Sequence, residues 1–229
     1  EEYKPTHIIN TVALSSTRQC DQFKKLAIDI NANFVKKLAD FVKNKHIKLI
    51  HLGSILEKET RPNCLYTSTK IMASKYIEET NNPNAVILRL PNHESPLRDE
   101  RFFIREIINS FQEILESHKK LRINIMDGKT KREWSWAPYL IQKILEMIIK
   151  DNYIDDFNEI TVKLSLIEFS MCVAKIFNLK EFEVICNKSG IYHIKNFIVP
   201  KIPETTCRWI KKIILIKQND IYNLERWCN

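Results

Sequence analysis

The alternation of short apolar runs with longer amphipathic stretches constrains the fold of this chain most. Residues 7–13, 47–52 and 85–90 are apolar runs of the kind found in strands that are buried on both faces. Between them, residues 21–43 carry apolar side chains at helical spacing, and a second helix is predicted from Tyr66 to about Glu79. This order predicts an α/β fold, in which helices wrap a parallel sheet through right-handed crossovers.

The regular alternation stops after Pro91. Beyond it we expect strands near residues 123–126 and 158–162, an extended piece at 197–200, and helices over residues 102–115, 138–149, 166–177 and 207–216. The change in pattern predicts two domains, residues 1–91 and a mixed lobe of residues 92–229, with some segments of about 120–163 returning to the first sheet.

Length and charge narrow the class of protein. With 229 residues and 44% hydrophobic content, the chain suits a globular protein. No apolar stretch reaches the roughly 18 to 20 residues that a bilayer span requires, so we expect no membrane span. The net charge of +8 is spread without a block of like charges, and we expect no nucleic-acid partner. The first residues lack Met, so we expect that the beginning of the protein is absent from this chain.

The cysteines and histidines do not form a recognisable metal site. The six cysteines show neither the CxxC pairs of a zinc site nor the dense spacing of a small secreted scaffold. We interpret them as reduced thiols of a cytoplasmic protein. No two of the six histidines lie at metal-ligand spacing, and we expect no metal.

Ser54, Tyr66 and Lys70 form the one constellation that points to chemistry. Residues four apart lie on one helical face, so Tyr66 and Lys70 would project together above the carboxyl end of the strand that carries Ser54. A nearby ammonium favours the phenolate and lowers the tyrosine pKa from about 10, as a general acid for carbonyl reduction requires. Ser54 would orient the carbonyl. The alternative is a chance pairing of Tyr and Lys, and the strand and helix around it favour catalysis.

The chain resembles the extended short-chain dehydrogenase/reductase family, the NAD-dependent epimerase/dehydratase family, over roughly residues 4–180. It is most similar to the dTDP-4-dehydrorhamnose reductase branch, which also includes the non-catalytic regulatory subunit of methionine adenosyltransferase. The likeness is carried by residues 4–11, 20–31, 38–39, 47–54, 86–89 and 128–134. The resemblance implies a partial Rossmann-type parallel sheet, with its first strands missing, and a smaller C-terminal substrate-binding lobe.

The same resemblance implies roles for individual residues. The catalytic positions are Ser54, Tyr66 and Lys70. NAD or NADP would be contacted by Tyr66, Lys70, Ala13 and Leu90. A nucleotide-sugar substrate would be contacted by Arg132 at its diphosphate and by Arg89, Asn92, His93 and Trp134. For Trp134, a place in the core is the favoured alternative, and Asn31 matches a family asparagine whose role is mainly structural.

Two functions therefore stay open. One is an NAD(P)-dependent reductase, epimerase or dehydratase that acts on a nucleotide-activated sugar. The other is a non-catalytic regulatory or accessory subunit of a larger complex, and a homodimer is equally open. The Ser, Tyr and Lys set favours the enzyme. The accessory subunit is favoured by the presence of only three glycines, since they cannot form the glycine-rich turn that holds a dinucleotide's pyrophosphate.

Overall fold

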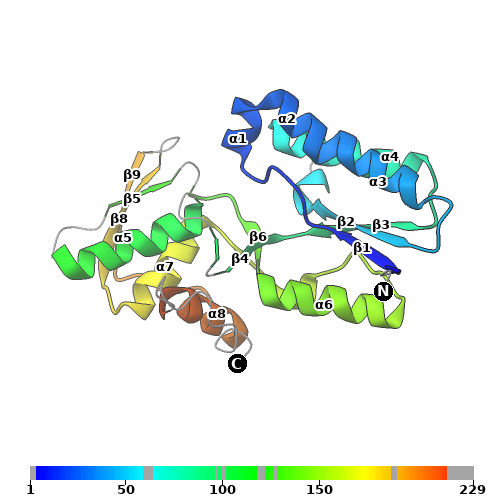
Figure 1. Cartoon of the computed structure of the whole chain (residues 1–229). Coiled ribbons are helices and arrows are strands. Elements are labelled where there is room, and N and C mark those ends of the chain that lie inside the picture. The colour runs from blue at the N-terminus through cyan, green and yellow to red at the C-terminus, as the bar shows by residue number, and fades with distance from the viewer. Residues whose placement is uncertain are drawn as a thin grey trace. The chain divides into compact units, whose positions relative to one another are not determined.

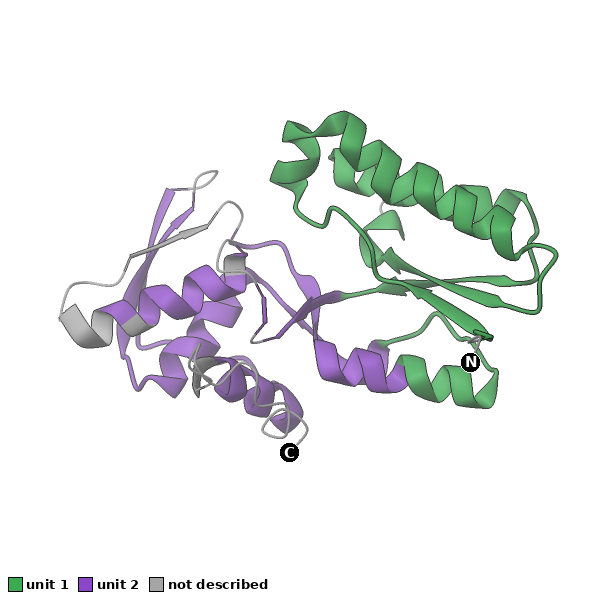
Figure 2. Ribbon diagram, viewed as in Figure 1, with its two compact units in different colours: residues 1–91, 144–157 green, residues 92–143, 158–229 purple. Residues whose placement is uncertain are grey.

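The computed structural model describes residues 4–58, 64–95, 97–98, 102–117, 122–125, 128–186 and 190–215. The chain divides into two compact units (Figure 2). Unit 1 comprises residues 1–91 and 144–157, and unit 2 comprises residues 92–143 and 158–229. Helix α6 (Ala137–Lys150) therefore begins in unit 2 and ends in unit 1.

Unit 1 is built on a parallel sheet whose strand order is β1–β2–β3 (Figure 1). These strands are β1 (His7–Asn10), β2 (Lys48–Ser54) and β3 (Ala85–Leu90). The central strand β2 places Leu49 opposite Ile8 of β1, and Ser54 opposite Leu90 of β3. The predicted α/β fold with a parallel sheet is confirmed.

Helices cover both faces of this sheet within unit 1 (Figure 1). On one face lie α3 (Phe34–Val42) and α4 (Leu65–Glu79), and on the other lies the part of α6 that belongs to unit 1. The core under α3 and α4 consists of Val35, Ala39, Val42, Leu49, Ala73 and Ile77. Cover on both faces explains why the strands read as continuous apolar runs.

The long helix predicted over residues 21–43 is wrong in detail, because it is divided into several pieces. Its segments are α1 (Thr17–Gln22), α2 (Lys24–Ile28), the π-helix η1 (Asp29–Asn33) and α3. The backbone of Phe23 leaves helical geometry between α1 and α2, with φ −117° and ψ 56°. Apolar periodicity does not reveal such a break, since the side chains on either side still follow the helical pattern.

Helix α4 follows a 3₁₀ turn, η2 (Ile55–Lys58), and ends just before Thr80. Asn81 then adopts a left-handed φ of 46°, a conformation that Asn tolerates at helix ends. In the same loop, the side-chain nitrogen of Asn82 donates to the carbonyl of Ala39 at 2.7 Å. The loop of residues 81–84 is thus tied to α3.

Unit 2 contains two further sheets, with strand orders β4–β6–β7 and β5–β8–β9. The strands are β4 (Asn92–Glu94), β5 (Arg122–Ile125), β6 (Arg132–Trp136), β7 (Thr161–Leu164), β8 (Glu181–Cys186) and β9 (Gly190–Lys195). The remaining elements are α5 (Phe103–Ser117), the 3₁₀ turn η3 (Asn158–Ile160), α7 (Leu166–Ile176) and α8 (Glu204–Leu215). Within the range 120–163, strands β5, β6 and β7 pair in these sheets, and residues 144–157 belong to unit 1.

Aromatic side chains fill the core of unit 2. Trp136 stacks on Trp209 with ring centroids 6.1 Å apart, and Phe169 stacks on Trp209 at 5.9 Å. Phe111 meets Phe182 edge to face at 5.6 Å. Such contacts stabilise a core beyond the area that they bury.

Helix α7 starts with a capping box. Ser165 accepts the backbone N–H of Glu168 at 3.2 Å, and Glu168 accepts the backbone N–H of Ser165 at 2.8 Å. Strands β4, β6, β8 and β9 were not predicted, because each mixes polar or charged with apolar residues. No helix in the described segments is both long enough and apolar enough to cross a bilayer.

Candidate functional site

The carboxyl edge of the unit 1 sheet brings together several of the predicted site residues. Ser54 is the last residue of β2 and lies in register with Leu90, the last residue of β3. Ala13 follows β1 by three residues and is half-buried. This edge is where ligands bind in open α/β sheets.

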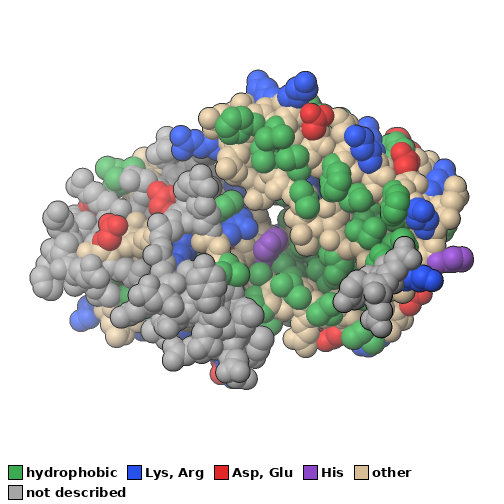
Figure 3. Space-filling view, viewed as in Figure 1, with side chains coloured by type: hydrophobic (Ala, Val, Ile, Leu, Met, Phe, Trp, Pro, Cys, Tyr) green, Lys and Arg blue, Asp and Glu red, His purple; other side chains and the backbone are tan. Residues whose placement is uncertain are grey.

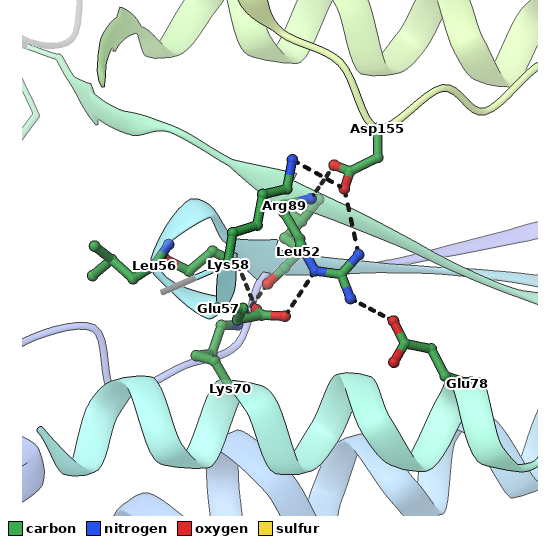
Figure 4. Close-up of polar contacts among 9 residues, drawn as sticks. Leu52, Leu56, Glu57, Lys58, Lys70, Glu78, Arg89 and Asp155 are labelled. Atoms are coloured by element: carbon green, nitrogen blue, oxygen red, sulfur yellow. Dashed lines mark hydrogen bonds and ion pairs between the residues drawn. The ribbon is translucent and has the colours of Figure 1, made fainter. Parts of the chain in front are cut away.

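Lys70 reaches this edge from α4. Its side chain is 4% exposed, and its Nζ donates to the carbonyl of Leu52 at 2.5 Å, two residues before Ser54 (Figure 4). Burial lowers the pKa of the Lys70 ammonium to about 8, although the Glu57 carboxylate acts to raise it. A cation is thus held under the end of β2, where it is only weakly hydrated.

Tyr66 lies in the first turn of α4, one helical turn before Lys70, and is half-buried. Its carbonyl accepts the hydroxyl of Thr69 at 2.8 Å. The helix begins where the sequence predicts, within one residue, so both side chains leave α4 on the same face. Catalytic roles for Ser54, Tyr66 and Lys70 remain predictions.

Arg89 is the centre of an ionic network that the sequence did not indicate (Figure 4). Its guanidinium contacts Glu57 through Nε at 3.2 Å, Glu78 through one terminal nitrogen at 2.5 Å and Asp155 through the other at 3.4 Å. The backbone N–H of Arg89 also donates to Asp155 at 2.6 Å. Each nitrogen of the guanidinium therefore has a carboxylate partner, and this geometry supports a structural role rather than the predicted contact with substrate.

Glu57 links this network to the predicted catalytic strand. One of its carboxylate oxygens accepts the backbone N–H of Ser54 at 2.6 Å, while the other faces Arg89. This approach requires Gly53, because a Cβ at that position would lie 2.7 Å from the same Glu57 oxygen. The network therefore fixes the backbone at the end of β2.

Asn31 clamps the loop after β1 against α4. Its side-chain oxygen accepts the N–H of Leu14 at 2.7 Å, and its nitrogen donates to the Leu14 carbonyl and to the Thr69 hydroxyl, both at 3.1 Å. The residue is 1% exposed and lies in the π-helix η1. Asn31 thus holds three segments around the carboxyl edge.

His51 lies in the middle of β2 and is 1% exposed. Its Nδ1 is 3.5 Å from the side-chain nitrogen of Asn10, and its Nε2 has no hydrogen-bond partner among the residues that the structure describes. Burial, followed by the charges of Lys70 and Arg89, lowers the pKa of His51 to about 3. A neutral imidazole is consistent with a core position.

The other predicted substrate residues belong to unit 2. Asn92 begins β4, where its side-chain nitrogen donates to the carbonyl of Glu133 at 3.0 Å, and His93 follows it, half-buried. Arg132 begins β6 and is half-buried. Trp134 is 6% exposed, packs on Phe169 and donates its indole N–H to a backbone carbonyl. Trp134 therefore occupies the core, and this position replaces the predicted contact with the substrate.

The chain offers a partial fit to NAD(P). The buried Lys70 ammonium at the carboxyl edge suits the hydroxyls of a nicotinamide ribose. A pyrophosphate cradle requires several glycines in one turn. Here Gly53 lies within β2 against Glu57, Gly128 lies in a bend before β6, and Gly190 begins β9. Among the described residues, no group of three His, Cys, Asp or Glu side chains could hold a metal ion.

The chain was compared with known proteins by sequence and by fold. Residues 1–158 match the family model described as the NAD dependent epimerase/dehydratase family. No curated protein matches the sequence.

Several solved structures share the fold. A dTDP-4-dehydrorhamnose reductase from Clostridium acetobutylicum is 16% identical, with a TM-score of 0.68 over 91% of this chain and 81% of that one. A UDP-N-acetylglucosamine 4-epimerase from Methanobrevibacter ruminantium, in complex with UDP-N-acetylmuramic acid, is 15% identical, with a TM-score of 0.67 over 91% and 75% of the two chains. A dTDP-glucose 4,6-dehydratase from Streptomyces venezuelae, with NAD bound, is 14% identical, with a TM-score of 0.64 over 90% of this chain and 72% of that one. At these identities the likeness shows the fold alone.

Proposed function

The chain belongs to the NAD-dependent epimerase/dehydratase family, and from this premise we propose that it is a reductase, epimerase or dehydratase of a nucleotide-activated sugar. The observation that carries the proposal is the buried Lys70 ammonium, which lies at the carboxyl end of β2 and one helical turn from Tyr66. A buried cation beside a tyrosine at this edge of a parallel sheet suits proton transfer to or from a carbonyl.

Tyr66 would exchange the proton with the sugar oxygen. The Lys70 ammonium favours the phenolate, because an opposite charge nearby stabilises the charged form. Since burial brings the pKa of Lys70 to about 8, the group is still mostly protonated at neutral pH and can exert this effect. Lys70 would also donate to the nicotinamide ribose.

Ser54 would position the reacting carbonyl. The backbone N–H of Ser54 donates to Glu57, and this hydrogen bond fixes the position from which the Ser54 side chain extends. The hydroxyl now accepts the N–H of Leu56 at 3.3 Å, which leaves its own hydrogen available for donation to a substrate oxygen. When bound, NAD(P) would supply or accept the hydride.

Three residues of β4 and β6 are the proposed substrate contacts. Arg132, half-buried at the start of β6, is the proposed ligand for the diphosphate, since a guanidinium pairs well with phosphate oxygens. Asn92 and His93 of β4 are further candidates. The enzyme names in the matched structures, which include dTDP- and UDP-sugar enzymes, support this substrate class.

Turnover of a panel of dTDP- and UDP-sugars with NAD or NADPH tests the proposal. Tyr66→Phe should abolish turnover and leave cofactor affinity nearly intact, because it removes only the proton-transferring hydroxyl. Tyr76→Phe is the matched control, since Tyr76 lies on the same helix and its hydroxyl donates to Asp40. Full activity of Tyr66→Phe would remove Tyr66 from the mechanism.

The second candidate is a non-catalytic regulatory or accessory subunit, and the count of three glycines favours it. Nicotinamide fluorescence should be measured on this chain and on a version that includes any upstream coding sequence. Failure of the longer version to bind NADH and NADPH would favour the accessory role and end the enzyme proposal.

A homodimer would use the outer surface of the unit 1 helices. Figure 3 shows hydrophobic side chains gathered among Lys and Arg over these helices. The exposed apolar residues there include Phe23, Leu26, Phe34, Phe41 and Met72, each at least 40% exposed. Apolar side chains gathered in this way are typical of interaction surfaces.

A further inference from the structure

Unit 2 contains a cavity of about 370 Å³. It lies between the second half of α7, the segment of residues 199–202 and α8. It is open to solvent on the side of the exposed residues Lys175, Asn178 and Lys211. Pockets for small molecules span roughly 300 to 1,000 Å³, so this space is large enough for a ligand.

The deeper part of the cavity is apolar. Ile210 is fully buried and Cys172 is 4% exposed, so these two side chains form the floor. The walls are half-buried aliphatic side chains, Ile176, Val199 and Ile202. Apolar surface of this kind favours contact with hydrocarbon over contact with water.

The mouth of the cavity is polar and positively charged. Lys175, Asn178 and Lys211 line it and are exposed, and none of the described lining residues is Asp or Glu. A lysine at a helix C-terminus often serves only to offset the helix dipole. Here the carbonyls of residues 173–175, in the last turn of α7, already accept the backbone N–H groups of residues 177–179. Lys175 is therefore not needed to satisfy these carbonyls, and its ammonium is suited to an anion. The exposed ammonium of Lys211 is suited to the same anion, although it also interacts electrostatically with Glu204 of α8.

We propose that this cavity binds a medium-chain acyl carboxylate. The hydrocarbon chain would lie against Ile210, Val199 and Ile202, and the carboxylate would sit at the mouth between Lys175 and Lys211. The proposal is independent of the sugar-nucleotide chemistry, since every lining residue belongs to unit 2 and none has a role in that chemistry.

The reactivity of a cysteine in the cavity can show whether a ligand is bound. Cys207 lines it and is a half-buried free thiol. Burial, with a smaller contribution from Cys207, raises the pKa of Cys172 to about 12, so Cys172 should stay unreactive. A bound acyl chain should therefore slow the alkylation of Cys207. Cys64, a half-buried free thiol of unit 1, serves as the internal reference.

Calorimetric titration with decanoate tests the proposal on the 229-residue chain. We expect binding by decanoate, weaker binding by the neutral decanol and none by acetate. Lys175→Ala and Lys211→Ala should each weaken decanoate binding about two- to fivefold, the range for exposed charge pairs. Lys180→Ala is the matched control, because Lys180 is exposed and lies outside the lining. Val199→Trp should fill the space and abolish binding.

The rate at which iodoacetamide alkylates each cysteine, measured by mass spectrometry, tests the proposal on the wild-type chain. Decanoate should protect Cys207 and leave Cys64 unchanged, a result that stands even if Val199→Trp does not fold. Absence of both binding heat and Cys207 protection at millimolar decanoate would overturn the proposal. So would binding that survives in a folded Val199→Trp variant, or decanol that binds as tightly as decanoate.

Discussion

Replacing Lys70 by Met would isolate the electrostatic cost of the buried ammonium at the carboxyl edge of the sheet. The side chain is 4% exposed, and burial lowers its pKa from 10.5 to about 8. Met keeps a flexible side chain of similar length without the charge. Any difference that changes with pH between the two proteins therefore reports on the ammonium itself.

The sign and size of the effect follow from the pKa values. Because the folded pKa lies below the unfolded one, the unfolded chain holds more protons on Lys70 between about pH 8 and pH 10.5. The free energy of unfolding therefore rises with pH across this window, and the full cost of burial is present below it. The difference between the two pKa values corresponds to roughly 3 kcal/mol.

Urea unfolding of the wild type and of Lys70→Met, compared from neutral pH to about pH 10.5, measures this cost. Relative to the variant, the wild type should gain roughly 3 kcal/mol as the pH rises. Loss of the hydrogen bond to the Leu52 carbonyl adds an offset that does not change with pH. Lys75→Met, an exposed position on the same helix, should follow the wild type at every pH. A difference between wild type and Lys70→Met that stays constant with pH would refute the reasoning.

Three further predictions concern the surroundings of this edge. Arg89→Met should lower the free energy of unfolding by about 3 kcal/mol, because it leaves the Glu57 carboxylate buried without its cation, whereas the exposed Arg208→Met should leave the urea midpoint unchanged. Gly53→Ala should cost about 1 to 3 kcal/mol in the same assay, and an unaltered stability would show that Glu57 can move away freely. His51→Phe should weaken the loss of stability between about pH 6.5 and pH 3, since the neutral imidazole must be protonated on unfolding; acid unfolding curves that coincide would contradict this.

Local spacing explains what could be predicted of the candidate site. Tyr66 and Lys70 are four residues apart in one helix, and regular helical geometry alone places them on one face. Ser54 was expected at the end of an apolar run, and it is the last residue of β2. The capping box of Ser165 and Glu168 is likewise a contact between neighbours in sequence.

Contacts between distant segments explain what could not be predicted. Arg89 and Asp155 are 66 positions apart, and the spacing within either segment gives no sign that they meet. From the sequence, Trp134 could either contact a ligand or lie in the core. Its packing on Phe169 and the hydrogen bond of its indole N–H show that it lies in the core.

The sequence by itself determined the strand–helix alternation of unit 1 and the shared helical face of Tyr66 and Lys70, because periodicity and short spacing act within single elements. Only the tertiary structure decided which carboxylates surround Arg89, how far Lys70 is removed from water, and that the strands of unit 2 form two separate sheets. These features depend on long-range packing and on the desolvation that it imposes, and neither has a local signature along the chain.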